Sequence, residues 1–275
     1  TNFSVPTMVS GLVMAVLVGT VLLGGIKRIA VVAGKLVPFM ALLYISATLV
    51  ILISHFTAIP AAVALVVDSA FNGAAASGGF AGATIMLALR MGIARGIFSN
   101  EAGLGSAPIA HAAAETNSPV RQGTIAMLGT FIDTLVICTM TGLVLIVTGV
   151  WNGEPQGAAM TLAAFTSALP FGDLLLSICV ALFAFTTMLG WSYYGERCAE
   201  FLLGPKIITP FRILWVIGIF VGTQMSLELV WKMTDALNGL MAIPNLIALI
   251  FLSPVVFKLT QEYFADEAKL LHENQ

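Results

Sequence analysis

The sequence predicts an all-α polytopic membrane protein, and three observations support this prediction. Hydrophobic residues make up 59% of the 275 residues, whereas charged residues make up only 9%. Soluble domains contain about 25% charged residues, so this chain lacks the polar groups that would cover a globular surface. Its apolar residues also form runs of about 20 residues, the length at which a helix crosses the hydrocarbon core of a bilayer.

Seven apolar runs are long enough to be predicted as spans, at about 6–26, 30–55, 79–115, 122–150, 172–196, 210–227 and 236–259. Two shorter stretches, 58–72 and 155–169, start at or near a proline and are followed by glycine or proline. We expect them to form interfacial or re-entrant helices that do not span the membrane. The whole chain, 1–275, is therefore predicted to be a single transmembrane domain whose third span is broken.

The lysine and arginine residues predict the orientation, because cytoplasmic loops carry an excess of both. The chain has twelve lysine and arginine residues. If the chain starts outside, Arg90 and Arg95 lie within the third span, and Lys232 alone lies outside. The remaining nine lie in or beside inner loops: Lys27, Arg28, Lys35, Arg121, Arg197, Lys206, Arg212, Lys258 and Lys269. We therefore expect a multi-pass protein of the cell membrane, surrounded by lipid, with a cytoplasmic C-terminus.

Composition also bears on partners and on the extent of the chain. The net charge is −2 and no basic run is present, which argues against binding of a nucleic acid. The three cysteines lie far apart, without a CxxC motif or a histidine-rich cluster, so no metal cofactor is indicated. The chain begins TNFSVPTMVSG, without an initiator methionine or a charged leader, so we expect it to be the C-terminal portion of a longer protein.

The third predicted span contains the most informative motif, RGIFSNEAGLGSAPIAHAAAETNSP, at 95–119. Gly103, Gly105 and Pro108 fall within six residues of one another. Glycine destabilises a helix interior by about 1 kcal/mol and proline by about 3 kcal/mol, which predicts a helix broken around 98–106. Non-helical backbone at membrane depth is tolerated only where it is buried in protein or lines a cavity, and broken helices indicate transporter binding sites.

The residues of this break suit a small amino acid as ligand. Phe98 could close over a small apolar side chain, and Ser99 and Asn100 offer neutral polar contacts. The backbone N–H groups from Gly103 to Ser106, which include that of Gly105, could hold a carboxylate at the start of the second half-helix.

Several ionisable residues lie within predicted spans, where such residues are costly and functional by default. Glu101 either belongs to the site or pairs with Arg95 or Arg90 to hold the bend. Asp133, which has threonines nearby, either tunes a cation path or pairs structurally. These alternatives stay open, so Arg95, Glu101 and Asp133 are given a structural or coupling role.

A second group of polar residues lies in the fifth predicted span, in FAFTTMLGWSYYG. Thr187 and Trp191 are four residues apart and so share one helix face. Hydroxyl oxygens suit a hard cation such as Na⁺. The alternative is that a threonine such as Thr186 bonds the carbonyl four residues before it and that Trp191 anchors the helix at the interface.

The stretch GIARGIFSNEAGLGSAPIAHAAAETNSPVRQG closely resembles the alanine/glycine:cation symporter (sodium:alanine symporter) family of bacteria and archaea. FIDTLVICTMTGLV at 131–144 and FAFTTMLGWSYYGE at 183–196 resemble the next segments of that family, in the same order. The resemblance implies the leucine-transporter-like fold of the amino acid–polyamine–organocation superfamily, with two inverted five-helix repeats. The seven spans then correspond to core helices 4–10, and the first and third core helices, with about half of the binding site, lie upstream.

The resemblance also implies a function, a secondary active symporter that couples Na⁺, or H⁺, to uptake of alanine or glycine by alternating access. Such a protein needs no cofactor and makes no covalent intermediate. Together with the residue chemistry, the resemblance predicts a substrate site made of Phe98, Ser99, Asn100, Gly103, Gly105, Thr187 and Trp191. It places Na⁺ near Thr186 and Thr187.

Three alternatives remain at this point. One is a symporter of the same fold for another small solute. Another is an intramembrane hydrolase that uses Ser106, His111 and Glu115, but the first two are about 140° apart around a helix and cannot easily meet. No HExxH motif supports a metalloprotease. The last is a channel, which is expected to repeat a charged or carbonyl ring across subunits.

Overall fold

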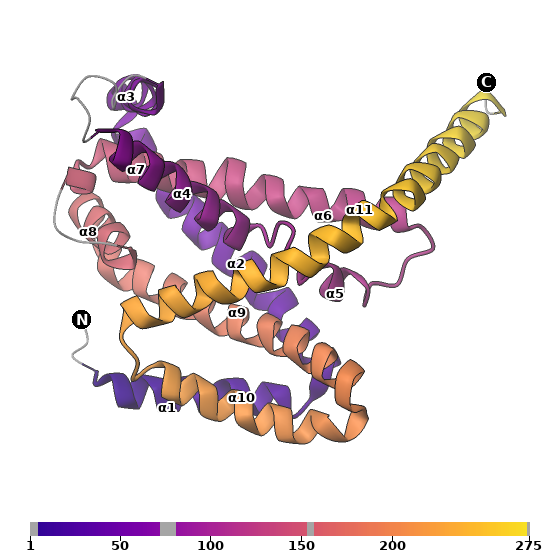
Figure 1. The fold of residues 1–275 in the computed structure, drawn as a ribbon. Coiled ribbons are helices and arrows are strands. Elements are labelled where there is room, and N and C mark those ends of the chain that lie inside the picture. The colour runs from indigo at the N-terminus through magenta and orange to yellow at the C-terminus, as the bar shows by residue number, and fades with distance from the viewer. Residues whose placement is uncertain (1–4, 72–80, 153–156, 274–275) are drawn as a thin grey trace. The chain divides into compact units, whose positions relative to one another are not determined.

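The computed structural model describes residues 5–71, 81–152 and 157–273, and all regular elements among them are helices (Figure 1). By length and composition, five helical segments in this part of the chain could cross a membrane: Gly25–Ser54, Pro119–Val147, Gly172–Leu203, Pro205–Gly222 and Leu227–Ala265. The chain is therefore helical throughout these ranges and has the apolar segments of a polytopic membrane protein. The first predicted span, 6–26, contains a helix of only 16 residues, and the third is divided.

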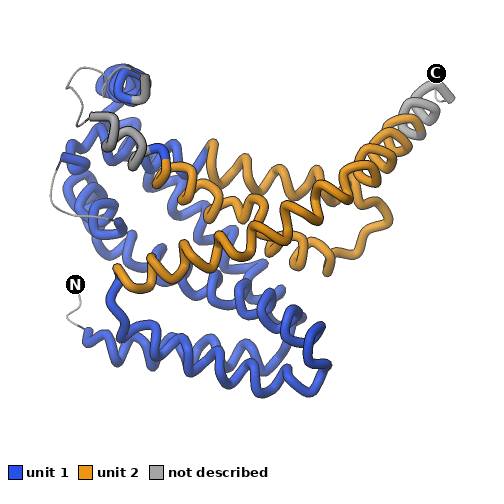
Figure 2. Tube along the Cα trace, viewed as in Figure 1, with its two compact units in different colours: residues 1–89, 136–227 blue, residues 90–135, 228–275 orange. Residues whose placement is uncertain are grey.

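The chain divides into two compact units, and each is described by itself (Figure 2). Unit 1 comprises residues 1–89 and 136–227, and unit 2 comprises residues 90–135 and 228–275. The helices of unit 1 are α1 (Thr7–Leu22), α2 (Gly25–Ser54), η1 (Phe56–Ala58), α3 (Ile59–Phe71), α7 (Thr139–Val147), η3 (Val150–Asn152), α8 (Ala158–Ala168), α9 (Gly172–Leu203), η4 (Pro205–Ile207) and α10 (Ile208–Gly222).

Helix α9 is the centre of unit 1, since α1, α2, α8 and α10 all pack against it. Asp173 lies in its first turn, where a negative charge interacts favourably with the helix dipole. The helix ends at Gly204, which has a φ of 80° and is followed by Pro205. Glycine readily adopts this left-handed conformation and proline cannot continue the helix. The helix therefore extends seven residues beyond the predicted end at 196.

A buried ionic cluster joins α9 to α10. Glu196 is 4% exposed and accepts from Arg212 Nε at 2.6 Å and from Arg212 Nη2 at 3.1 Å. Arg197 Nη2 donates to the same carboxylate at 2.7 Å. A buried carboxylate is tolerated when cations and hydrogen bonds compensate its charge. Sequence reasoning did not anticipate this cluster, because Glu196 and Arg212 belong to different helices.

An aromatic group forms the larger buried cluster of unit 1. The ring of Tyr44 on α2 stacks on Phe165 of α8 at 5.6 Å between centroids and meets Phe183 of α9 edge-on at 6.1 Å. The Tyr44 and Thr141 hydroxyls are hydrogen-bonded at 2.6 Å. Burial of aromatic rings with one satisfied hydroxyl is a favourable way to join several helices. This cluster therefore fixes the short helix α8 against the long helices.

Replacing Phe165 with alanine is expected to destabilise unit 1 strongly. Phe165 is 0% exposed, and a buried phenylalanine truncated to alanine typically costs about 3–5 kcal/mol through lost contacts and the cavity left behind. The midpoint of thermal unfolding of the purified full-length protein in detergent should fall by several degrees. Phe201→Ala is the matched control, because Phe201 is 89% exposed in the chain. Equal midpoints for the two variants would contradict the packing role of Phe165.

Unit 2 contains residues 90–99 of α4 (Ala81–Ser99), α5 (Ala107–His111), α6 (Pro119–Thr130), the first five residues of η2 (Phe131–Cys138) and residues 228–273 of α11 (Leu227–Glu273). Helix α6 begins with Pro119 after Ser118, whose hydroxyl accepts from the Arg121 N–H at 3.2 Å. A serine cap followed by proline is a favourable helix start. η2 is a π-helix. This form is rare in proteins as a whole, and where it occurs it often lies at a functional site.

The last predicted span, 236–259, is much shorter than the helix that contains it. Helix α11 runs from Leu227 to Glu273 without interruption at Pro244 or Pro254. Its polar ends carry Glu228–Lys232 and Lys258–Glu262 pairs, each four residues apart, with N–O distances of 2.6 and 3.8 Å. Such pairs support helical structure outside the apolar region. Hydropathy alone therefore underestimates the helix at both ends.

Candidate functional site

The candidate site of unit 2 is built around the interruption between α4 and α5. Helix α4 ends at Ser99 and α5 begins at Ala107, so residues 100–106 lie outside regular helix, in the region where the break was expected. Glu101, Gly103 and Gly105 have φ values of 51°, 73° and 81°. Glycine adopts this left-handed conformation at little cost, whereas a residue with a side chain pays about 1–2 kcal/mol. The two glycines therefore permit the bend, and Glu101 holds it at an energetic cost.

Side-chain hydrogen bonds tie the beginning of this bend to η2. The Asn100 Nδ2 donates to the Gly96 carbonyl at 3.1 Å, and the Thr134 hydroxyl donates to Asn100 Oδ1 at 2.8 Å. The Ser99 hydroxyl donates to Asp133 Oδ2 at 2.5 Å. Ser99 and Asn100 thus have partners within the protein, and both partners lie in the π-helical turn. Asp133, which was expected either to serve a cation or to pair structurally, is the acceptor for Ser99.

Several donors on the other side of the bend are unused. Between the described residues, no backbone hydrogen bond is donated by the N–H of Gly103, Gly105 or Ser106. The Ser106 side chain is 1% exposed, and its hydroxyl has no hydrogen-bond partner among those residues. Leaving a buried polar group unpaired costs about 1–3 kcal/mol. Three N–H groups and one hydroxyl within four residues are thus without a protein hydrogen-bond acceptor among the described residues.

The second half-helix differs from the expectation drawn from 79–115. Helix α5 has only five residues and ends at His111, so it contributes a weaker dipole than a full half-helix. Any carboxylate at the bend therefore depends on the individual N–H groups of the loop. The Gln122 amide donates to His111 Nδ1 at 2.8 Å, which gives His111 a partner on α6 instead of the hydroxyl of Ser106.

Arg95 has a partner that sequence reasoning did not identify. The sequence suggested Glu101 as a partner for Arg95. In the structure, Arg95 forms a salt bridge with Asp235 of α11. Its guanidinium also lies over the ring of Trp231, with 4.2 Å between Cζ and the ring centroid. Phe98 meets the same ring edge-on at 6.1 Å between centroids. Residues 140 positions apart in the sequence are thus neighbours, and no local motif indicates such a contact.

The other predicted site residues lie on α9, in unit 1. The Thr186 hydroxyl donates to the Leu182 carbonyl at 2.9 Å and to that of Phe183 at 3.2 Å, which is the structural alternative considered for these threonines. Thr187 lines a cavity of about 540 Å³ together with Tyr44 and Thr161. Trp191 contacts Tyr194 edge-on at 5.7 Å between ring centroids. Within unit 1, Thr187 thus lines a cavity, whereas the Thr186 hydroxyl is satisfied within its own helix.

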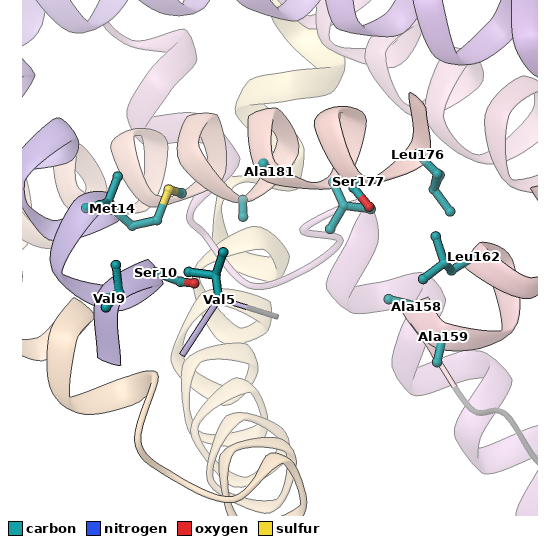
Figure 3. Close-up of a pocket in the computed structure, with 13 residues that line it drawn as sticks. Val5, Val9, Ser10, Met14, Ala158, Ala159, Leu162, Leu176, Ser177 and Ala181 are labelled. Carbon is teal, nitrogen blue, oxygen red and sulfur yellow. The ribbon is translucent and has the colours of Figure 1, made fainter. Parts of the chain in front are cut away.

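An apolar cavity of about 730 Å³ lies beside the one that contains Thr187. Its lining comes from α1, α8, α9 and Val5, and Figure 3 shows Met14 of α1, Leu162 of α8 and Ala181 of α9 among the lining side chains. Ser10 and Ser177 are the polar residues that line it. The two cavities share lining residues of α8 and α9, so the one lined by Thr187 is adjacent to a larger apolar one.

A metal cluster of the usual protein type is not found in the part of the chain that the structure describes. Within those ranges, no group of three or more His, Cys, Asp or Glu residues could hold a metal ion. Hydroxyl and carbonyl oxygens, in contrast, are abundant at the bend and at the α9 threonines, and these are ligands that suit hard cations.

Comparison with known proteins bears on the class of protein to which this chain belongs. The chain matches the profile of the sodium:alanine symporter family over residues 1–275. It is 48% identical over 277 residues to an uncharacterised transporter of Haemophilus influenzae, covering 100% of this chain and 60% of that protein. It is also 48% identical over 266 residues to the sodium/alanine symporter AgcS of Methanococcus maripaludis, covering 95% and 58%.

A third relative carries a different substrate in its name. The chain is 39% identical over 264 residues to the probable sodium/glutamine symporter GlnT of Bacillus subtilis, covering 95% of this chain and 54% of that protein. The chain thus spans 54–60% of the length of these curated relatives. With a family match over its whole length, the chain belongs to the sodium:alanine symporter family, a family of transporters and not of enzymes.

Proposed function

We propose that the full-length protein is a secondary active symporter that couples a Na⁺ or H⁺ gradient to uptake of a small neutral amino acid by alternating access. Family membership supports the class of activity. The single structural observation that carries the proposal is the break at 100–106, with its unused N–H donors and the buried Ser106 hydroxyl. Broken helices with unsatisfied backbone groups are the usual substrate sites of secondary transporters.

The bend would hold the substrate by its α-carboxylate. The N–H groups of Gly103, Gly105 and Ser106, with the Ser106 hydroxyl, would receive the carboxylate. Phe98 would cover the substrate side chain. The hydrogen bonds of Asn100 and Ser99 to the π-helical turn keep this end of the bend in place before the ligand arrives, which lowers the entropic cost of binding.

The remaining residue roles are part of the same proposal. Thr187 and Trp191 would face the substrate, and Thr186 and Thr187 would contribute to Na⁺ binding. Because Thr186 already donates to two carbonyls, its remaining capacity is that of an acceptor, which is what a cation requires. Arg95, Glu101 and Asp133 would hold the bend and couple its movement to that of neighbouring helices.

The wider architecture is also proposed. The chain would form one transmembrane domain of seven spans, 1–275, in a leucine-transporter-like fold of inverted repeats, as core helices 4–10. The C-terminus would be cytoplasmic, and the part of the protein upstream of this chain would supply the remaining half of the site. Lipid would surround the apolar faces, which carry many exposed large side chains in this chain.

Alanine or glycine is the proposed substrate. The relatives' names differ on this point, since AgcS is named for alanine and GlnT for glutamine. Our choice rests on two large rings, Phe98 and Trp191, which would restrict the space left for a substrate side chain.

Uptake of labelled alanine by the full-length protein in proteoliposomes tests the function. We expect saturable accumulation that requires an inward Na⁺ or H⁺ gradient, and the two gradients are varied separately to identify the coupling ion. Unlabelled glycine should compete. Uptake of neither amino acid under either gradient would contradict the proposal, and current that does not saturate with alanine would point to a channel.

Trp191→Ala is expected to abolish this uptake without loss of the protein from the membrane. The ring would form part of the wall against the substrate, and a truncated wall leaves a space that water fills. Trp151→Ala is the matched control, because Trp151 lies in η3 and is 44% exposed. Uptake and membrane levels are measured together for each variant, and normal uptake by Trp191→Ala would remove Trp191 from the site.

A further inference from the structure

Four side chains of unit 2 form a continuous chain of contacts, from Asp235 to Arg95, from Arg95 to Trp231 and from Trp231 to Phe98. We call them the α4–α11 cluster. Arg95 is paired with Asp235, and its guanidinium lies 4.2 Å from the Trp231 ring centroid. The Trp231 and Phe98 rings meet at 6.1 Å and 76°, an edge-to-face geometry that aromatic pairs favour. The cluster therefore connects the last helix to the residue that precedes the bend.

The sequence spacing explains how two helices build this cluster. Arg95 and Phe98 are three residues apart in the last two turns of α4, and Trp231 and Asp235 are four residues apart in the second and third turns of α11. Residues at these spacings lie on one face of a helix. Each helix therefore presents one aromatic and one charged side chain, and the two pairs interlock.

The contacts in the cluster are specific and of limited strength. The Arg95 and Asp235 side chains are 34% and 41% exposed, and ion pairs with this exposure contribute little to stability. Arginine is suited to the position because its planar guanidinium can pair with a carboxylate and stack on a ring at the same time. A lysine could make the ion pair but not the stacking. The arrangement thus orients side chains more than it stabilises the fold.

We propose that Trp231 and Asp235 are positioning residues for the substrate site, which act on Phe98 through Arg95 and the edge-to-face contact. Asp235 holds the guanidinium over Trp231, and Trp231 holds the ring of Phe98 against the bend. The last helix thereby sets how closely Phe98 covers the side chain of a bound amino acid. This inference rests on the proposed function, and it assigns selectivity for substrate size to a helix that contributes no ligand of its own.

Transport kinetics of the full-length protein in proteoliposomes test this proposal. Trp231→Leu removes the ring, Asp235→Asn removes the charge at constant size, and Trp231→Phe retains an aromatic edge. For Trp231→Leu we expect the KM for alanine to rise about tenfold, as expected for loss of one aromatic pair and one cation–π contact, with Vmax nearly unchanged. Inhibition of alanine uptake by glutamine should become stronger, and Trp231→Phe should restore most of the discrimination.

The ion pair is tested with a double substitution and a matched control. Asp235→Asn should raise the KM, and Arg95→Met combined with Asp235→Asn should be no worse than Arg95→Met alone, because the two residues act as one unit. Lys232→Met is the control, since it removes the Glu228 pair on the same part of α11, where both side chains are more than 70% exposed. It should leave KM and selectivity unchanged.

The outcomes separate this inference from the proposed function. If the unmodified protein transports alanine but Trp231→Leu and Asp235→Asn lower only Vmax or membrane level, with KM and glutamine inhibition unchanged, the cluster is merely structural and the inference is wrong. If the unmodified protein takes up no neutral amino acid under either gradient, the proposed function fails, and the positioning role fails with it. A raised KM with relaxed size selectivity, rescued by Trp231→Phe, supports the inference.

Discussion

Gly105→Ala is expected to reduce alanine uptake by the full-length protein at least tenfold. Gly105 has a φ of 81°, which costs a residue with a side chain about 1–2 kcal/mol. A Cβ at this position would also lie 2.9 Å from Asn245 Oδ1 and 3.0 Å from Asn245 Cγ. Overpacking of this kind costs about 1–3 kcal/mol, so the bend should change its backbone conformation and lose the alignment of its N–H groups.

Two control variants separate the effect of the positive φ at Gly105 from the effect of the collision with Asn245. Gly92→Ala is the matched substitution, because Gly92 lies within α4 and a Cβ there meets nothing within 4 Å. It should leave uptake unchanged. Gly105→Ala combined with Asn245→Ala relieves the collision but not the strained φ, so we expect only partial recovery. Uptake by Gly105→Ala equal to that of Gly92→Ala would show that the conformation of the bend does not matter for transport.

Asn100→Ala is expected to abolish uptake while membrane expression is retained. The amide of Asn100 links the Gly96 carbonyl in the last turn of α4 to the Thr134 hydroxyl in η2. Alanine removes both hydrogen bonds, and each bond contributes about 0.5–1.5 kcal/mol where its partner can find water, with a larger cost where it cannot. The turn that follows contains the left-handed Glu101, so it depends on this anchor to keep its form.

Two further variants test the role of the Asn100 amide in uptake: Thr134→Val, which removes its partner, and Asn117→Ala, which is the control. Thr134→Val removes the hydrogen bond between Asn100 and η2 but leaves the bond from Asn100 to Gly96, so its effect on uptake should be smaller than that of Asn100→Ala. In the double variant the loss should not exceed that of Asn100→Ala, because both substitutions break the same contact. Asn117→Ala changes an exposed loop asparagine and should be silent. Additive losses from Asn100 and Thr134 would mean that their hydrogen bond is not the relevant interaction.

Local features of the chain were predictable because local energies decide them. The end of α4 near Ser99 follows from Gly103, Gly105 and Pro108, whose backbone preferences act within a few residues. Thr186 could be expected to bond the carbonyl of Leu182 because that partner lies one turn away on the same helix. The class of membrane protein follows from composition, and the motif at 95–119 indicated the family before any contact was known.

Boundaries and irregular helices were less predictable. The continuation of α11 beyond the predicted end at 259 depends on helix propensity and charge pairs, which a search for apolar runs does not measure. The π-helical turn at 131–138 has no sequence signal that we could identify. The short α5 likewise differs from the half-helix expected up to 115, because the expectation rested on apolarity and not on hydrogen bonding.

The amino-acid sequence by itself determined that the chain is helical and membrane-embedded, that its third apolar segment is broken around 98–106, and which family it belongs to. These properties depend on composition, on backbone preferences of single residues and on contiguous motifs. Only the tertiary structure decided that Ser99 bonds Asp133, that Asn100 bonds Thr134 and that Arg95 reaches Asp235 on a helix 140 residues away. Such partners depend on how helices pack, and a charge or amide carries no local signal that identifies which distant group will face it.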